Sequence, residues 1–172
     1  MTDCILFASL FATFAVLRNA TASGPAGSDI FEMPLVLTET LILLVSSFTC
    51  GLALVALKAR KIKPMVIALA ATYVLGIAFL TIEISEFAKL ISEGHSPAQS
   101  AFLSAFFTLV GTHGLHIFVG LLWLLVLVAV LARRGLTDKW VRQMTLFALF
   151  WHFLDLVWIF IFTVVYLMGI IK

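Results

Sequence analysis

Two apolar stretches of the chain carry histidine and aspartate side chains near their centres. His113 and His116 lie within residues 101–132, and His152 and Asp155 lie within residues 141–171. Each pair has i, i+3 spacing, which places both members on one face of a helix. Imidazole and carboxylate groups can bind a metal ion or haem iron, relay protons, or hydrogen-bond across helices. These four residues are therefore the first candidates for chemistry.

Composition explains why such positions are unusual. Hydrophobic residues make up 63% of the chain and charged residues 12%, and the mean hydropathy is +1.17. A soluble domain averages about 25% charged residues, so we expect a membrane protein with one domain over residues 1–172. An ionisable group at the bilayer centre costs about 2.5–3.5 kcal/mol on insertion scales. It usually faces a protein partner or a polar cavity.

Segment lengths predict the helices that must position these groups. A transmembrane helix needs about 20 mostly apolar residues. Four segments satisfy this requirement: residues 33–57, 64–89, 101–132 and 141–171. A fifth apolar run, residues 4–17, would span only about 21 Å as a helix. It is either a tilted or interfacial half-span or a full span with a truncated start, and we interpret it as the second. The sequence thus predicts an all-α bundle of five transmembrane helices with short connections.

The basic residues predict the orientation of this bundle. Eight of the eleven Lys and Arg residues fall in residues 58–63 and 133–142. Alternation of five helices places these two connections on one side of the membrane. By the positive-inside rule that side is cytoplasmic. The N-terminus is then expected inside and the C-terminus outside.

The four central residues are compatible with several roles. Along the expected helices they lie about 16–22 Å from the helix starts, which places them in one layer near the midplane. We expect His113, His116, His152 and Asp155 to act as structural hydrogen-bonding groups that tie the helices over residues 101–132 and 141–171 together. The alternatives are a b-type haem held by His113 or His116 with His152, a metal site, and a proton path. One histidine pair could hold only one haem, whereas electron transfer across a bilayer normally needs two. The i, i+3 spacing places two imidazoles only loosely for binding one metal ion. A continuous proton path would need more polar residues than these segments contain.

Other polar residues lie nearer the expected membrane boundaries. Glu83 and Glu86 share one helix face near the outer end, where they and Glu39 are expected to pair with Lys89 or to be solvated. Arg133, Arg134 and Arg142 could contact lipid phosphates, because guanidinium groups match phosphate geometry. They could equally be solvated residues that set the topology.

The aromatic residues and the absent motifs narrow the functional classes further. Trp140 is expected to be an interfacial anchor, whereas Trp151 and Trp158 share a stripe typical of a packing face. The sequence shows no phosphate-binding loop, dinucleotide fingerprint, nucleophile elbow or nucleic-acid-binding pattern. A stand-alone haem protein and a small proton-linked transporter therefore remain as alternatives to a non-catalytic subunit.

Several segments together resemble one family. The motifs GTHGLHIFVG and FWHFLDLVWIFIFTVVYLMG resemble the last two helices of subunit III of haem-copper terminal oxidases. The segment EISEFAKLISEG resembles the preceding helix and loop, and DCILFASLFATFAVL resembles a helix that carries a buried carboxylate, with Asp3 at its place. The resemblance covers nearly the whole chain. It is strongest to the five-helix branch found in cytochrome bo ubiquinol oxidases.

The resemblance implies a role that the residues alone do not reveal. It implies an accessory subunit in the bacterial inner membrane, without an active site, haem, copper or quinone site of its own. Its expected partners are the catalytic subunit I, which carries the haem and copper, the other oxidase subunits, and phospholipids. The whole complex would oxidise ubiquinol, reduce oxygen to water and move protons outward. Subunit III of a cytochrome c oxidase is the alternative within the same family.

Overall fold

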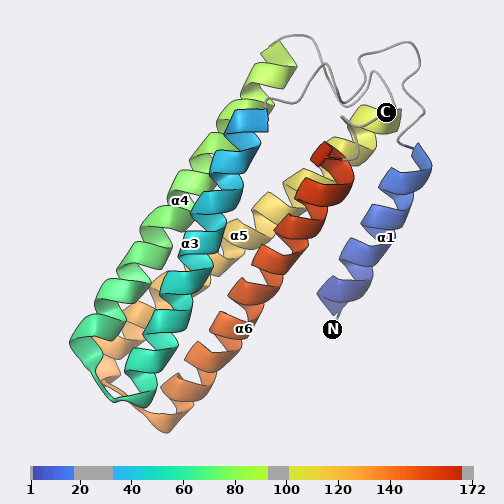
Figure 1. The fold of residues 1–172 in the computed structure, drawn as a ribbon. Coiled ribbons are helices and arrows are strands. Elements are labelled where there is room, and N and C mark those ends of the chain that lie inside the picture. Colours follow the sequence, from blue (N-terminus) through green and yellow to red (C-terminus); the bar gives the residue numbers. More distant parts are fainter. Residues whose placement is uncertain (1, 18–32, 93–100, 168–172) are drawn as a thin grey trace.

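The computed structural model describes residues 2–17, 33–92 and 101–167, which form a helical bundle (Figure 1). The helices are α1 (Thr2–Leu17), α3 (Met33–Lys58), α4 (Ile62–Ser92), α5 (Ala101–Arg134) and α6 (Asp138–Ile161). A π-helical turn, η1 (Phe162–Leu167), continues α6. The five predicted helices are confirmed. The predicted end of the last one, at residue 171, lies outside the described residues.

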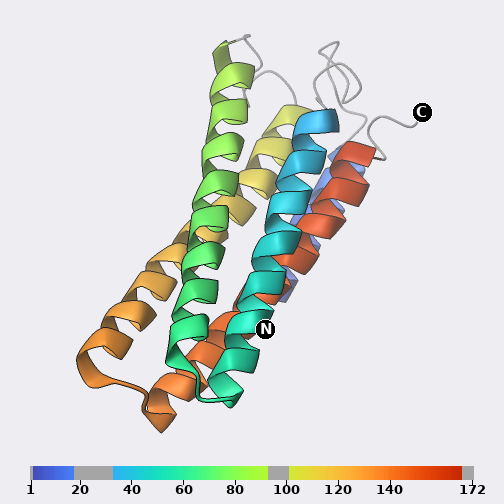
Figure 2. The same cartoon turned by 60° about the vertical axis from the view of Figure 1, so that its left-hand side comes forward.

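Helices α3 to α6 run alternately up and down, and each is long and apolar enough to cross a membrane (Figures 1 and 2). Helix α1 has 16 residues, and it extends along only part of the bundle, packing mainly on α5. The pairs α3–α4 and α5–α6 pack side by side, and α3 also packs against α6. The predicted all-α polytopic membrane architecture is therefore confirmed.

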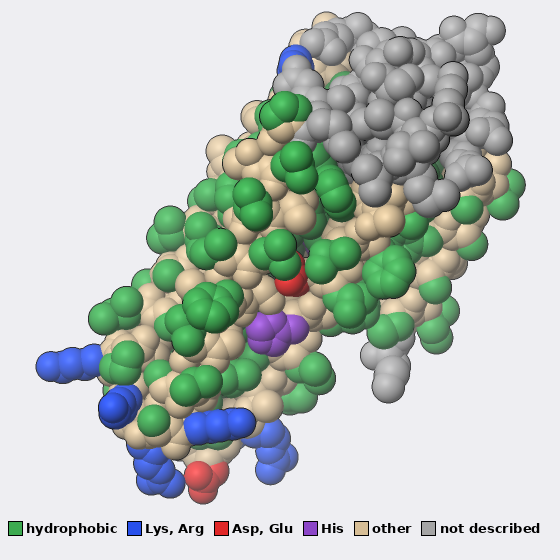
Figure 3. All heavy atoms as spheres, viewed as in Figure 1, with side chains coloured by type: hydrophobic (Ala, Val, Ile, Leu, Met, Phe, Trp, Pro, Cys, Tyr) green, Lys and Arg blue, Asp and Glu red, His purple; other side chains and the backbone are tan. Residues whose placement is uncertain are grey.

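The two connections rich in basic residues lie at the same end of the bundle. Figure 3 shows most of the visible lysine and arginine side chains gathered there. The connection between α5 and α6 is built by local backbone chemistry. Gly135 ends α5 with φ +69°, a left-handed conformation that glycine adopts without a Cβ penalty. The Thr137 hydroxyl then caps α6 by accepting from the Trp140 backbone N–H at 3.2 Å.

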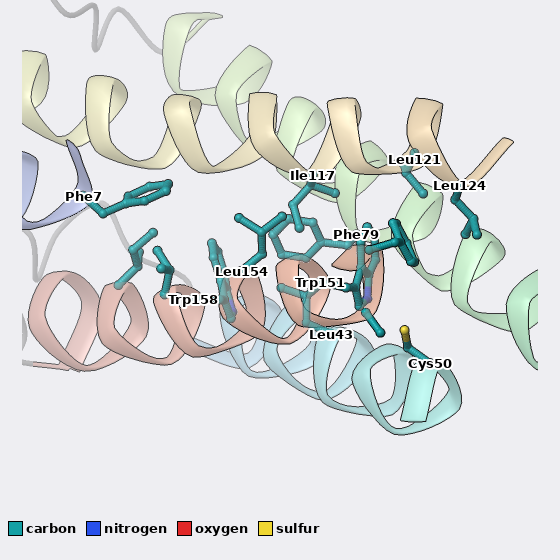
Figure 4. Close-up of a cluster of buried hydrophobic side chains, with 14 of the residues drawn as sticks. Phe7, Leu43, Cys50, Phe79, Ile117, Leu121, Leu124, Trp151, Leu154 and Trp158 are labelled. Carbon is teal, nitrogen blue, oxygen red and sulfur yellow. The ribbon is translucent and has the colours of Figure 1, made fainter. Parts of the chain in front are cut away.

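The centre of the bundle is filled by large aromatic side chains of α6 (Figure 4). Trp151 is buried where glycines allow α4 and α5 to approach it. A Cβ on Gly76 would lie 3.0 Å from Trp151 Cη2, and one on Gly120 would lie 3.0 Å from Trp151 Cζ3. The indole is therefore accommodated only because both positions lack a side chain. Trp158 is also fully buried, so the predicted packing role of the Trp151–Trp158 stripe is confirmed.

Trp140 corrects one prediction. Its side chain is only 1% exposed, and its Nε1–H donates to the Leu127 carbonyl at 2.8 Å. The residue lies close to the basic end of the bundle, as expected, but inside the packing between α5 and α6. Because the indole N–H donates to a backbone carbonyl within the protein, it does not need a hydrogen-bond partner at the membrane interface.

Candidate functional site: polar side chains within the bundle

His116 connects α5 to α1. Its Nδ1–H donates to the Thr112 carbonyl one turn earlier, at 2.7 Å, and its Nε2 lies 3.5 Å from Asp3 Oδ1. Phe7 packs against the ring, with centroids 5.1 Å apart. Because a carbonyl can only accept, the Nδ1 hydrogen is committed to Thr112. A full hydrogen bond between Nε2 and Asp3 therefore requires one further proton on either group.

His113 lies about one turn away and packs against three aromatic rings. It is fully buried, stacked on Trp158 with a centroid distance of 5.3 Å and an interplanar angle of 30°. Phe79 meets its ring edge-on at 6.0 Å, and Phe7 lies at 6.2 Å. Neither ring nitrogen has a hydrogen-bond partner among the described residues. The side chain of His113 therefore packs among aromatic rings of α1, α4 and α6.

His152 connects α6 to α3. Its Nδ1 and the Ser47 hydroxyl are hydrogen-bonded at 2.6 Å. Asp155, one turn further along α6, lies beside the same hydroxyl. Its Oδ1 is buried and has no hydrogen-bond partner within the described segments. Ser47, His152 and Asp155 thus form one polar group, which we call the α3–α6 polar group.

The four predicted residues do not form a single hydrogen-bonded cluster. In the described part of the chain, no hydrogen bond joins His113 or His116 to His152 or Asp155. The histidines of α5 contact α1, α4 and α6 through Asp3 and aromatic rings. The polar residues of α6 instead contact α3. The four residues therefore do not share one hydrogen-bonded network, although His113 stacks on Trp158 of α6.

Hydroxyl groups of α3 are the partners that sequence reasoning missed. Trp151 Nε1–H donates to Ser46 Oγ at 2.9 Å, and Trp158 Nε1–H donates to Thr40 Oγ1 at 3.1 Å. Thr40 and Ser47 are seven residues apart, which is two helical turns. Their partners on α6, Trp158 and His152, are separated by a similar distance along that helix. This matched spacing is the sequence signal that could have indicated the contact between α3 and α6.

The carboxylates nearer the outer end are more buried than expected. Glu39 is 0% exposed and Glu83 is 3% exposed, so of the two expected alternatives, solvation is wrong for these two residues. Their oxygens have no hydrogen-bond partner among the described residues. Glu83 lies against α5 at Gly114, where a Cβ would meet its Oε1 at 2.8 Å. Glu86 is partly buried, and Asp3 is about half exposed at 45%.

The arginine side chains of the basic end are exposed at Arg133, Arg134 and Arg142. Beside them, a cavity of about 400 Å³ lies between the end of α3 and the start of α6. Lys58, Arg60 and Asp138 line it. Sequence reasoning had assigned the first two only to topology. Within the described residues, no group of three or more His, Cys, Asp or Glu side chains is placed to hold a metal ion.

The fold and these contacts define a multi-pass helical membrane protein whose central polar groups connect its own helices. Comparison with known proteins places it more narrowly. A family profile described as cytochrome c oxidase subunit III matches residues 1–170. The chain belongs to that family.

Individual relatives agree with the family assignment. The chain is 59% identical to the cytochrome bo(3) ubiquinol oxidase subunit 3 of Pseudomonas aeruginosa, covering 98% of this chain and 81% of the relative. It is 46% identical to the quinol oxidase subunit 3 of Bacillus subtilis, covering 98% and 82%. It is 47% identical to the cytochrome c oxidase subunit 3 of Bacillus sp. strain PS3, again covering 98% and 82%.

Proposed function

We propose that this chain is the accessory, non-catalytic subunit III of a proton-pumping haem-copper quinol oxidase in the bacterial inner membrane. The observation that carries the proposal is the 59% identity, over 98% of this chain, to subunit 3 of a ubiquinol oxidase. The complex would oxidise ubiquinol and reduce oxygen to water. This chain would contribute to the assembly rather than to the chemistry.

The contacts of the polar residues support a non-catalytic role. His116 is engaged with α1, His152 with α3, and His113 is enclosed by aromatic rings. These contacts stabilise helix packing, as hydrogen bonds between transmembrane helices commonly do. The proposal assigns the haem and copper to the catalytic subunit I, with which this chain would associate.

Lipid binding is the second part of the proposed role. Lys58 and Arg60 line the cavity at the basic end, and Arg133, Arg134 and Arg142 are exposed nearby. Basic groups in such a position attract anionic headgroups on the cytoplasmic side of a membrane. The proposed orientation therefore has this end, and the N-terminus, facing the cytoplasm.

A cytochrome c oxidase subunit III is the second candidate. The 47% identity to the cytochrome c oxidase subunit 3 of Bacillus sp. strain PS3 favours it. This identity is as high as the 46% identity to the quinol oxidase subunit 3 of Bacillus subtilis. The two candidates differ in the electron donor of the assembled complex. They do not differ in what this chain itself would do.

Purification from the native membrane tests the proposal. The chain is tagged, extracted in a mild detergent, and its co-purifying proteins are identified by mass spectrometry. We expect a large haem-copper subunit, a haem absorption band, and ubiquinol-dependent oxygen consumption by the purified complex. Oxygen consumption with reduced cytochrome c alone would favour the second candidate, and recovery of the chain without partners would contradict both.

A further inference from the structure

A polar group is exposed in the middle of one apolar face of the bundle. Figure 3 shows a histidine and an acidic side chain side by side, surrounded by hydrophobic side chains. The α3–α6 polar group contributes such residues: His152 and Asp155 are both partly exposed. His152 lies about 21 Å along α6 from Asp138. The group is therefore near the middle of the membrane-spanning length.

The apolar residues around this group define the face. On α3, Leu44 lies about one turn before Ser47, and Gly51 lies about one turn after it. On α6, Leu156 lies about one turn after His152. Leu44 and Leu156 are exposed by 41% and 52%. We refer to these residues, with the polar group, as the α3–α6 face.

Gly51 indicates that this face is open for close packing. A Cβ built on Gly51 would meet no atom within 4 Å. At Gly76 and Gly120, by contrast, the Trp151 ring occupies the space next to the glycine. The glycine therefore has no packing role among the described residues. Ser47 and Gly51 form a small-xxx-small pattern, which allows the backbone of a neighbouring membrane helix to approach closely.

Lipid chains would be an unfavourable cover for this face. Hydrocarbon offers no hydrogen bond, and a polar group left without a partner in the membrane costs free energy. His152 and Asp155 are both partly exposed on this face, and an ionised carboxylate can only accept hydrogen bonds. The complementary neighbour is a helix that presents a hydrogen-bond donor at this depth.

We propose that the α3–α6 face is the docking surface for a transmembrane helix of another subunit of the oxidase. That helix packs closely over Gly51 and places a donor side chain opposite Asp155 and His152. The inference rests on the proposed function, because it requires a multi-subunit complex. It goes further by assigning the surface and the chemistry of the partner.

Photocrosslinking in the intact complex tests the surface. A diazirine-bearing residue is placed at Leu44 or at Leu156, and the matched control is Leu115, which is 61% exposed on α5. We expect both test positions to crosslink one helix of a partner subunit, and the control not to crosslink it. Crosslinks only to phospholipid at Leu44 and Leu156, in a complex that still contains its partners, would overturn the inference and leave the proposed function intact.

Substitution of Gly51 tests the close approach independently. Gly51→Leu adds a side chain where this chain has no neighbouring atom, so its own helices should pack as before. We expect recovery of the partner subunit after extraction to fall about tenfold, with unchanged helical content. The control Val74→Leu, at a 64% exposed position on α4, should retain the partner. Equal recovery for both variants would contradict docking over Gly51, whereas absence of any partner from the unsubstituted chain would contradict the proposed function itself.

Discussion

At the scale of single residues, the intramembrane histidines differ in what surrounds them. His113 packs against aromatic rings, His116 bridges a backbone carbonyl and Asp3, and His152 meets a serine hydroxyl. The polar contacts of His116 and His152 reduce the cost of a polar ring in the membrane, whereas the ring nitrogens of His113 have no hydrogen-bond partner among the described residues. Their effects on stability are therefore expected to differ more than their shared residue type suggests.

Removal of the His152 ring tests the hydrogen bond to Ser47. His152→Leu should lower the thermal stability of the purified complex, or weaken its assembly, by about 1–2 kcal/mol. Turnover of the complexes that remain intact should stay close to normal, because His152 is assigned a structural role. Thermal unfolding in detergent and oxygen consumption measure the two quantities.

A double-mutant cycle with Ser47→Ala provides the control for this prediction. If the 2.6 Å bond carries the effect, the double variant should lose less stability than the sum of the single variants. Additive losses would show that the two side chains act separately. A collapse of turnover in intact His152→Leu complexes would contradict the structural role.

At the scale of helices, close packing depends on where small residues meet large ones. Gly120 on α5 faces Trp151 and Phe150, whose nearest atoms lie 3.0 and 3.1 Å from a Cβ at that position. At Gly111, about two and a half turns earlier on the same helix, an added Cβ would meet only Phe87, at 3.6 Å. The two glycines therefore have different tolerances for an added methyl group.

Alanine substitution should separate these two positions. Gly120→Ala should destabilise the bundle by about 1–3 kcal/mol, because the indole cannot move without disturbing the packing around it. Gly111→Ala should be close to neutral, since 3.6 Å is ordinary van der Waals contact. Midpoints of thermal unfolding in one detergent compare them. Equal losses would argue against the position of Trp151 between α4, α5 and α6.

The connection between α5 and α6 gives a second prediction at this scale. Gly135→Ala should cost about 1–2 kcal/mol, because a Cβ is disfavoured at the observed φ of +69°. Gly135→Asn is the matched variant, since asparagine adopts the left-handed conformation more readily. The asparagine variant should retain more of the original thermal stability. The reverse order would contradict the backbone conformation of this turn.

The helices were predictable from sequence, whereas their contacts were less so. Residues 33–57 and 101–132 were expected to be helical, and the structure has Met33–Lys58 and Ala101–Arg134, because apolar length alone determines a membrane span. The partners of His152 and Trp151 were not predicted. Ser46 and Ser47 are common residue types whose role depends on which helices become neighbours, and helix pairing is not encoded in local periodicity.

At the scale of the whole molecule, the distribution of charge predicts the orientation. Lys61, between α3 and α4, and Asp138, the first residue of α6, lie at one end of the bundle, and Ser92 ends α4 at the other. By the positive-inside rule the first end should face the cytoplasm. The known contacts within the chain do not depend on this assignment.

Cysteine labelling in intact cells measures the orientation. In a background with Cys4 and Cys50 replaced by alanine, Ser92→Cys should react with a membrane-impermeant maleimide. Lys61→Cys and Asp138→Cys should react only after the membrane is permeabilised. The opposite pattern would reverse the proposed orientation without affecting the fold.

The tryptophan positions give the protein an intrinsic optical probe. Three of its four tryptophans, Trp140, Trp151 and Trp158, are on α6 and are at most 1% exposed. Indoles in such dry surroundings emit at shorter wavelengths than indoles in water, so the ultraviolet emission of the chain should be dominated by blue-shifted light from one helix. Fluorescence of the unlabelled protein can therefore follow changes around α6 in real time.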